Sequence, residues 1–147
     1  MKLKLKNIPI PEAHLLSIIL GIILQKLFPK VIFRQQLSGH LIGWLLIILG
    51  LGISFWAVFE AGKLDLSSPQ RLITSGPYGY SRNPMYVGWT LIYLGFGLVV
   101  NSIWLILLFP IMVTYHHFTV IQKEERDLEQ KFGTKYKEYR NQVRRYL

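Results

Sequence analysis

The sequence contains no cysteine and is poor in acidic residues. Its 147 residues include no Cys, and 8 Asp and Glu stand against 17 Lys and Arg. The absence of cysteine excludes disulfide bonds, thiolate metal sites and a cysteine nucleophile. An excess of basic residues is typical of proteins that bind nucleic acid or anionic lipid headgroups. Because the basic residues flank apolar segments, we expect contact with membrane lipids and none with nucleic acid.

A signal-peptide cleavage site is also lacking. Lys2, Lys4 and Lys6 precede an apolar run at 13–28, as in a signal peptide, but the residues after this run are bulky and charged. Cleavage requires small residues, so we expect the run to persist as a first helix. At about 16 residues it is short for a membrane span, and the sequence leaves open whether it crosses the bilayer or lies in the interface.

Three more apolar segments follow, at 41–61, 84–100 and 103–121. The first of these, with about 21 residues or ~30 Å of helix, matches the thickness of a hydrocarbon core. Asn101 and Ser102 separate the other two and predict a tight turn between antiparallel helices. We therefore predict an all-α, polytopic membrane protein with about four transmembrane helices.

The distribution of the basic residues predicts how these helices are oriented in the membrane. Of the 17 Lys and Arg, all but Lys26, Lys30 and Arg34 would lie on one side of a membrane that the chain crosses four times. That side carries both termini and the loop before residue 84. Since cytoplasmic segments of membrane proteins carry most Lys and Arg, we expect the N- and C-termini to be cytoplasmic.

The segment 122–147 is charged but carries apolar residues at spacings of three and four. This stripe consists of Leu128, Phe132, Tyr136, Tyr139 and Val143. The pattern predicts amphipathic helix, broken at Gly133, that forms a cytosolic cap by lying along the membrane surface or by folding over the loop before residue 84.

The stretch 74–88 reads T-S-G-P-Y-G-Y-S-R-N-P-M-Y-V-G and is rich in turn formers. Asn83 is a favourable helix N-cap, and Pro84 suits the first helical position because its missing N–H costs nothing there. The free N–H groups and the positive dipole end of this helix lie beside Arg82. They predict a site for a carboxylate or a phosphate.

Glu124 and Glu125 form an acidic pair at the predicted exit of the fourth helix. The charge pattern favours a solvated face on which they pair with basic neighbours, and a ligand site is the alternative. Those neighbours are Lys123, Arg126 and Lys131. His116 and His117 lie two turns earlier on the same helix. Side chains from one helix do not easily converge on one ion, so we expect no metal site.

Gly88, Gly95 and Gly97 leave gaps on the surface of the third predicted helix. Such gaps allow close approach to the helix backbone. The approaching group is either a neighbouring helix or a flat ligand, and the sequence leaves both open.

Two blocks of the sequence carry a family resemblance. G-P-Y-G-Y-S-R-N-P-M-Y-V-G and E-E-R-D-L-E-Q-K-F-G-T-K-Y-K-E-Y stand on either side of the predicted hairpin. Together they resemble the integral-membrane methyltransferases that include isoprenylcysteine carboxyl methyltransferase and the phospholipid N-methyltransferases, over residues 72–145. The resemblance implies one domain, with N-terminal helices at 1–71 and a cofactor-binding core at 72–147. It also implies S-adenosylmethionine as cofactor, bound without a Rossmann domain, and the sequence has no G-x-G-x-x-G motif.

Matching by position implies the residues of the site. The implied cofactor-binding residues are Tyr78, Arg82, Asn83, Pro84, Tyr86, Gly88, Gly95, Gly97, Glu124 and Glu125. The C-terminal part of the signature is matched by Phe132, Gly133, Tyr136, Tyr139 and Arg145. The chemistry of the acceptor adds two catalytic roles. Arg145 or Arg82 would orient a carboxylate acceptor, and Glu125 or a histidine would take the proton of an amine acceptor.

The resemblance leaves two classes of methyl acceptor open. Asn83, where carboxyl methyltransferases usually have His, favours a phospholipid amine, whereas the C-terminal signature favours a prenylcysteine-like carboxylate. The predicted function is thus S-adenosylmethionine-dependent methyl transfer to a lipophilic small molecule at the cytosolic membrane face. The alternative is a noncatalytic membrane scaffold or assembly protein. The enzymatic function requires that the start of the third helix and the exit of the fourth helix lie close together on the same face of the membrane.

Overall fold

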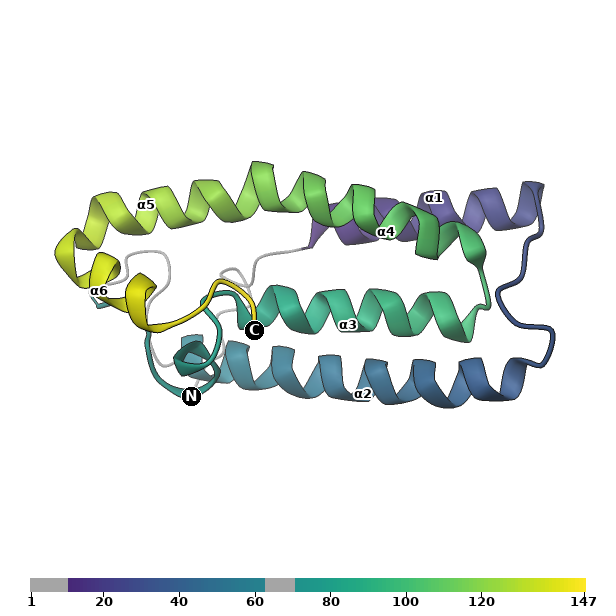
Figure 1. Ribbon diagram of the computed structural model, residues 1–147, viewed down its shortest axis with the longest axis horizontal. Coiled ribbons are helices and arrows are strands. Elements are labelled where there is room, and N and C mark those ends of the chain that lie inside the picture. Colours follow the sequence, from purple (N-terminus) through teal and green to yellow (C-terminus); the bar gives the residue numbers. More distant parts are fainter. Residues whose placement is uncertain (1–10, 63–70) are drawn as a thin grey trace.

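The protein is a bundle of helices in residues 11–62 and 71–147, the part of the chain that this computed structural model describes. The long helices lie along one axis, and the shorter ones gather at one end (Figure 1). In chain order the elements are α1 (Glu12–Leu27), α2 (Gln36–Ala61), the 3₁₀ turn η2 (Gly76–Gly79), α3 (Pro84–Val99), α4 (Ile103–His116), the π-helical turn η3 (His117–Ile121), α5 (Gln122–Phe132) and α6 (Thr134–Gln142).

Most predicted boundaries are confirmed. Helix α3 begins at Pro84, and Gly133, with a φ of 54°, separates α5 from α6. Helix α2 begins at Gln36, earlier than its apolar run. Near this end Gly39 is buried, and a Cβ there would lie 2.8 Å from the Phe33 ring and 3.4 Å from the Leu98 carbonyl oxygen. The prediction for Lys2, Lys4 and Lys6 concerns residues outside the described part of the chain.

Glycines bring α2 and α3 into backbone contact. A Cβ on Gly43 would lie 2.7 Å from the Gly95 carbonyl oxygen, and one on Gly50 would lie 2.6 Å from the Gly88 carbonyl oxygen. No side chain fits between the backbones at these points. Close approach of this kind is how membrane helices pack when lipid removes the hydrophobic drive between them.

A separate apolar core joins α1 to α3 and α4. It is centred on Tyr93, Leu105 and Met112, all buried. The Tyr93 hydroxyl lies 2.7 Å from Ser17 Oγ and donates to the Leu105 carbonyl at 3.0 Å, so one polar group links all three helices. A buried hydroxyl needs such partners, and these fix α1 against the α3–α4 hairpin.

The predicted turn at 101–102 is also a hydrogen-bonding centre. Asn101 adopts a φ of 54°, a conformation that asparagine tolerates better than most residues. Its Oδ1 accepts from the N–H groups of Ile32 and Phe33 at 3.0 and 2.9 Å, and its Nδ2 donates to the Phe33 carbonyl at 2.8 Å. The turn therefore holds the connection between α1 and α2 at the end opposite the short helices.

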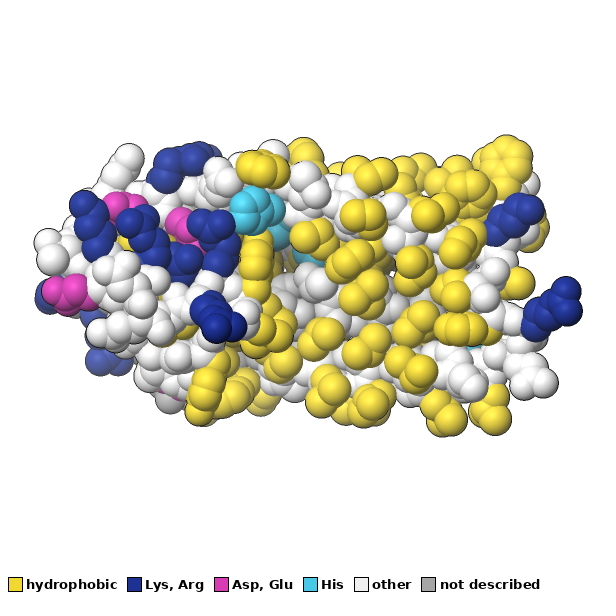
Figure 2. Space-filling view, viewed as in Figure 1, with side chains coloured by type: hydrophobic (Ala, Val, Ile, Leu, Met, Phe, Trp, Pro, Cys, Tyr) yellow, Lys and Arg dark blue, Asp and Glu magenta, His cyan; other side chains and the backbone are white. Residues whose placement is uncertain are grey.

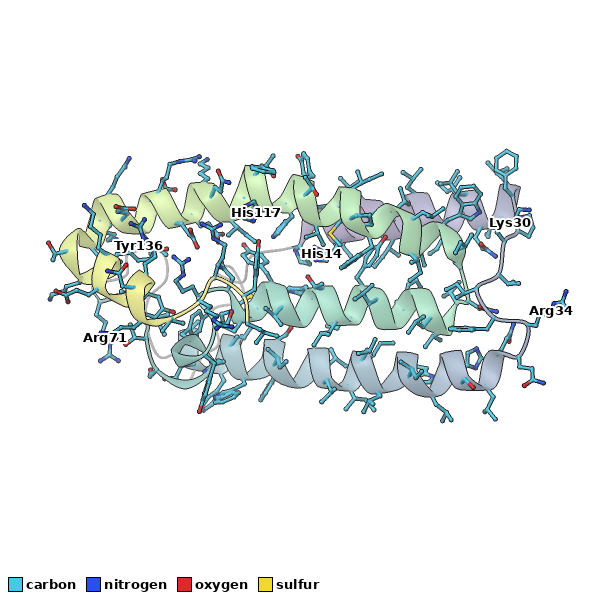
Figure 3. All side chains as sticks on the ribbon, in the orientation of Figure 1. His14, Lys30, Arg34, Arg71, His117 and Tyr136 are labelled. Carbon is cyan, nitrogen blue, oxygen red and sulfur yellow. The ribbon has the colours of Figure 1, made fainter. Side chains whose placement is uncertain are left out.

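Within residues 11–62 and 71–147, two helices are long and apolar enough to cross a membrane, as judged by length and composition. They are Gln36–Ala61, which is α2, and Ile103–Phe132, which joins α4, η3 and α5 end to end. Helix α3 is a shorter apolar helix. Figure 2 shows a mainly hydrophobic body with Lys and Arg concentrated at one end, and Figure 3 places Lys30 and Arg34 at the other. Two of the four predicted spans thus have the required length, and the other two stay predictions.

We predict that Gly50→Ala lowers the stability of the bundle whereas Gly52→Ala does not. The new Cβ at position 50 would press on the Gly88 carbonyl, while nothing lies within 4 Å of a Cβ at position 52. Overpacking of this kind costs about 1–3 kcal/mol. The control should be unchanged or slightly more stable, because alanine favours helix over glycine. Thermal unfolding followed by circular dichroism in detergent checks both, and equal effects would contradict the packing of α2 on α3.

Candidate functional site

The start of α3 and the junction of η3 with α5 meet at the charged end of the bundle (Figure 2). The Tyr86 hydroxyl, in the first turn of α3, donates to Glu124 Oε1 at 2.7 Å. Beside it, Arg82 NH1 lies 3.3 Å from Glu125 Oε1. The meeting of these two elements, on which the predicted site depends, is therefore confirmed.

Glu125 is the centre of a buried ion cluster. Arg145 donates to it through both Nε and NH2, at 3.0 and 2.8 Å, and Arg82 approaches the same carboxylate. The side chains of Arg82 and Glu125 are only 8% and 11% exposed. Hydrogen bonding to Glu125 raises the pKa of Arg145. The favoured expectation of a solvated face was therefore wrong, because the partners come from distant segments.

Two tyrosines of α6 extend this cluster toward the loop 71–83. Tyr136, labelled in Figure 3, has a buried ring and accepts from Arg82 Nη1 at 3.4 Å. The Tyr139 hydroxyl donates to the Tyr78 carbonyl at 2.7 Å. Burial raises the pKa of Tyr78 to about 12, with further contributions from Glu124 and Glu60. The Tyr78 hydroxyl is therefore a neutral donor at cellular pH.

Asn83 occupies the predicted N-cap position of α3, but its side chain does not cap the helix. Its Nδ2 instead donates to the Arg145 carbonyl at 3.1 Å, which also accepts from Ser81 Oγ at 3.3 Å. The Arg82 N–H donates to the Arg144 carbonyl at 2.9 Å. The C-terminal segment is thus hydrogen-bonded to the loop through its backbone carbonyls. No side chain caps the N–H groups in the first turn of α3.

The three glycines proposed from the sequence lie at contacts between helices. Gly88 and Gly95 face α2, and a Cβ on Gly97 would lie 3.2 Å from the Leu105 Cβ. Packing, one of the two alternatives that the sequence left open, accounts for all three positions. Their part in cofactor binding stays a prediction.

Sequence reasoning missed two polar residues near the site. Glu60, at the end of α2, accepts from Ser75 Oγ at 2.6 Å, and its charge contributes to the raised pKa of Tyr78. His14, in the first turn of α1, is 3% exposed and packs against His116. Both were visible as lone polar residues at the end of an apolar run, a position that often marks function in membrane proteins. The described residues hold no group of three or more His, Asp or Glu suited to a metal ion.

We predict that Glu125→Ala destabilises the protein far more than Glu129→Ala. Removing Glu125 leaves Arg82 charged and buried, which costs about 3–5 kcal/mol. Glu129, one turn further along α5, pairs with Lys137 and Arg140, whose side chains are 60% and 43% exposed. Pairs this exposed contribute about 0–1 kcal/mol. Denaturant unfolding of both variants tests the difference, and similar midpoints would refute the buried cluster.

Comparison with known proteins finds one family and two named relatives. A family model described as phospholipid methyltransferase matches residues 38–135. A methanethiol S-methyltransferase from Crocosphaera subtropica is 31% identical over 123 residues, covering 74% of this chain and 47% of that protein. A protein-S-isoprenylcysteine O-methyltransferase from Saccharomyces cerevisiae is 32% identical over 142 residues, covering 89% of this chain and 59% of that protein.

No solved structure matches the chain significantly. The chain spans about half the length of the two relatives, 47% and 59%. The family match nevertheless includes the loop, the α3–α4 hairpin and the acidic pair that meet in the site. On this match the protein belongs to the phospholipid methyltransferase family.

Proposed function

We propose that this protein binds S-adenosylmethionine where α3 begins and α5 leaves the apolar body, and transfers its methyl group to a lipophilic acceptor. The observation that carries the proposal is the pairing of Tyr86 with Glu124 beside Arg82, which puts acidic and basic groups at one helix start. S-adenosylmethionine has a carboxylate, an ammonium and a sulfonium. A site for S-adenosylmethionine therefore needs basic groups for the carboxylate and acidic groups for the cations, no further apart than the length of one nucleoside.

The basic side of the site fits the carboxylate. Arg82 Nε is buried and has no hydrogen-bond partner among the described residues, although its NH1 serves Glu125 and Tyr136. Arg82 lies two residues before α3, and no side chain caps the free N–H groups in the first turn of this helix. An unpaired guanidinium N–H and a helix N-terminus together bind carboxylates well. Asn83 and Pro84 would shape this half of the site.

The acidic side of the site fits the cations. Glu124 accepts a hydrogen bond from Tyr86, and the charges of Glu124 and Glu60 both contribute to the raised pKa of Tyr78. A carboxylate so placed pairs with an ammonium or accepts from ribose hydroxyls. We therefore assign Glu124, Tyr78 and Tyr86 to the ammonium or ribose half.

Methyl transfer from a sulfonium is an in-line displacement, so it depends mainly on position and on exclusion of water. Arg145 donates two hydrogen bonds to Glu125, and Arg82 forms an ion pair with the same carboxylate. We therefore propose that these two residues position the loop and the C-terminal segment, in place of the proton transfer and acceptor orientation expected from the sequence. Helix α6 and the C-terminal residues would cover the cofactor as a cap.

The membrane arrangement completes the proposal. Four helices cross the bilayer, both termini are cytoplasmic, and the acceptor enters from the lipid while the cofactor enters from the cytosol. The relatives are named for acceptors of different kinds, a thiol and an isoprenylcysteine, and the family for phospholipids. An acceptor with an apolar part is common to the isoprenylcysteine and phospholipid cases and agrees with the exposed hydrophobic surface (Figure 2).

Isothermal titration of the detergent-purified protein with S-adenosylmethionine tests the proposal. We expect saturable binding that Glu124→Gln weakens by about tenfold, or about 1.4 kcal/mol, because the amide keeps the volume but loses the charge. Glu138→Gln, on the exposed surface of α6, is the matched control and should bind as the wild type does. If the wild type shows no saturable binding, the chain is instead a noncatalytic membrane protein.

A further inference from the structure

Two histidines from distant helices meet next to the proposed cofactor site. His14 of α1 and His116, the last residue of α4, have ring centroids 5.2 Å apart and are 3% and 5% exposed. The His116 ring also packs edge-on against Tyr86, with centroids 4.5 Å apart. Figure 3 places His14 between α1 and α3, inside the bundle. The pair thus adjoins the site through Tyr86.

All four ring nitrogens of this pair are buried without a hydrogen-bond partner in the described residues. The neighbouring hydroxyls are engaged elsewhere, that of Tyr86 with Glu124 and that of Tyr93 with Ser17 and Leu105. Native proteins rarely leave buried polar atoms unpaired, because each costs the free energy of its lost hydration. Packing alone would be served better by apolar rings.

The absence of hydrogen-bond partners at this histidine pair does not extend to the next histidine in the chain. His117, the next residue along, is paired, with its Nδ1 2.6 Å from the Tyr146 hydroxyl. The helix changes to a π-helical turn at His117–Ile121, directly after His116. Such turns inside α-helices are frequent at functional sites, since they re-aim side chains at some cost in stability. His14, moreover, lies outside the residues that the family model matches.

We propose that His14 and His116 form the headgroup subsite for the methyl acceptor, and that the acceptor is a thiol or an amine on an apolar tail. This inference rests on the proposed function. A thiol or an amine brings a proton that must leave when the methyl group arrives, and a neutral imidazole can accept that proton. A carboxylate acceptor brings no such proton and needs a cation, but the site's arginines serve Glu125 and the cofactor carboxylate.

The transfer balances as follows. The lone pair of the acceptor sulfur or nitrogen bonds to the methyl carbon, and the electron pair of the broken carbon–sulfonium bond stays on the donor sulfur. The acceptor's proton passes to a ring nitrogen of His116 or His14. The second ring lies edge-on to the first and offers a further proton acceptor.

Nuclear magnetic resonance of histidine ring nitrogens tests the subsite in the wild-type protein. The chain has only 4 His, so ¹⁵N-histidine labelling gives signals that single substitutions can assign. The probes are octanethiol, octylamine and octanoate at equal concentration in the same detergent. We expect the thiol or the amine to shift the His14 and His116 signals and leave His40, at the far end of α2, unchanged. Shifts caused by octanoate alone, or by no probe, would overturn the proposal.

Two variants supply the second readout. His14→Phe and His116→Phe keep a ring of similar size but remove the nitrogens, so they should fold at least as well as the wild type. We expect methylation of octanethiol or octylamine to fall about 10²-fold, with S-adenosylmethionine binding unchanged, while His40→Phe changes neither. Wild-type rates in both variants would refute the subsite. Absence of cofactor binding in the wild type would instead refute the proposed function, and the probe titration decides the subsite even if a variant fails to fold.

Discussion

The charge cluster around Glu125 is the interaction on which the rest of this end depends. It joins Arg82 of the loop, Glu125 of α5 and Arg145 of the C-terminal segment through contacts of 2.8–3.3 Å. Burying charges is costly unless each is paired, so the three segments are stable in this arrangement only together. The cluster therefore sets where Arg82 and Glu124 stand, although Glu125 itself has no free oxygen to offer a reaction.

The packing of the apolar helices holds the start of α3 beside the junction of η3 with α5, where the site lies. Backbone contacts at Gly43 and Gly50 hold α3 against α2, and the Tyr93 hydroxyl holds α1 against the hairpin. Asn101 closes the opposite end. With α3 fixed at both ends, Tyr86 meets Glu124 and His116 meets His14 without a loop having to order first. Preorganisation of this kind is what methyl transfer mainly needs.

Features determined by a few neighbouring residues could be predicted from the sequence. Pro84 begins α3 because proline suits the first helical position, and Gly133 ends α5 because it takes a positive φ. The turn at Asn101 followed from its position between two apolar runs.

Features determined by distant contacts could not be predicted in this way. The local charge pattern around Glu125 favoured solvent, and only the fold brings in Arg82 and Arg145. Asn83 is at the cap position, but tertiary hydrogen bonding to Arg145 wins over capping. His14 reads as one polar residue in an apolar run until α1 places it on His116.

Hydrogen–deuterium exchange with and without S-adenosylmethionine tests most directly that the start of α3 and the junction at α5 hold one ligand together. A ligand protects the backbone amides whose opening it opposes. We predict added protection at 82–87 and at 122–127 in the same titration, with the turn at 100–103 unchanged. Protection of only one of these two segments, or protection confined to the far end of the bundle, would contradict it.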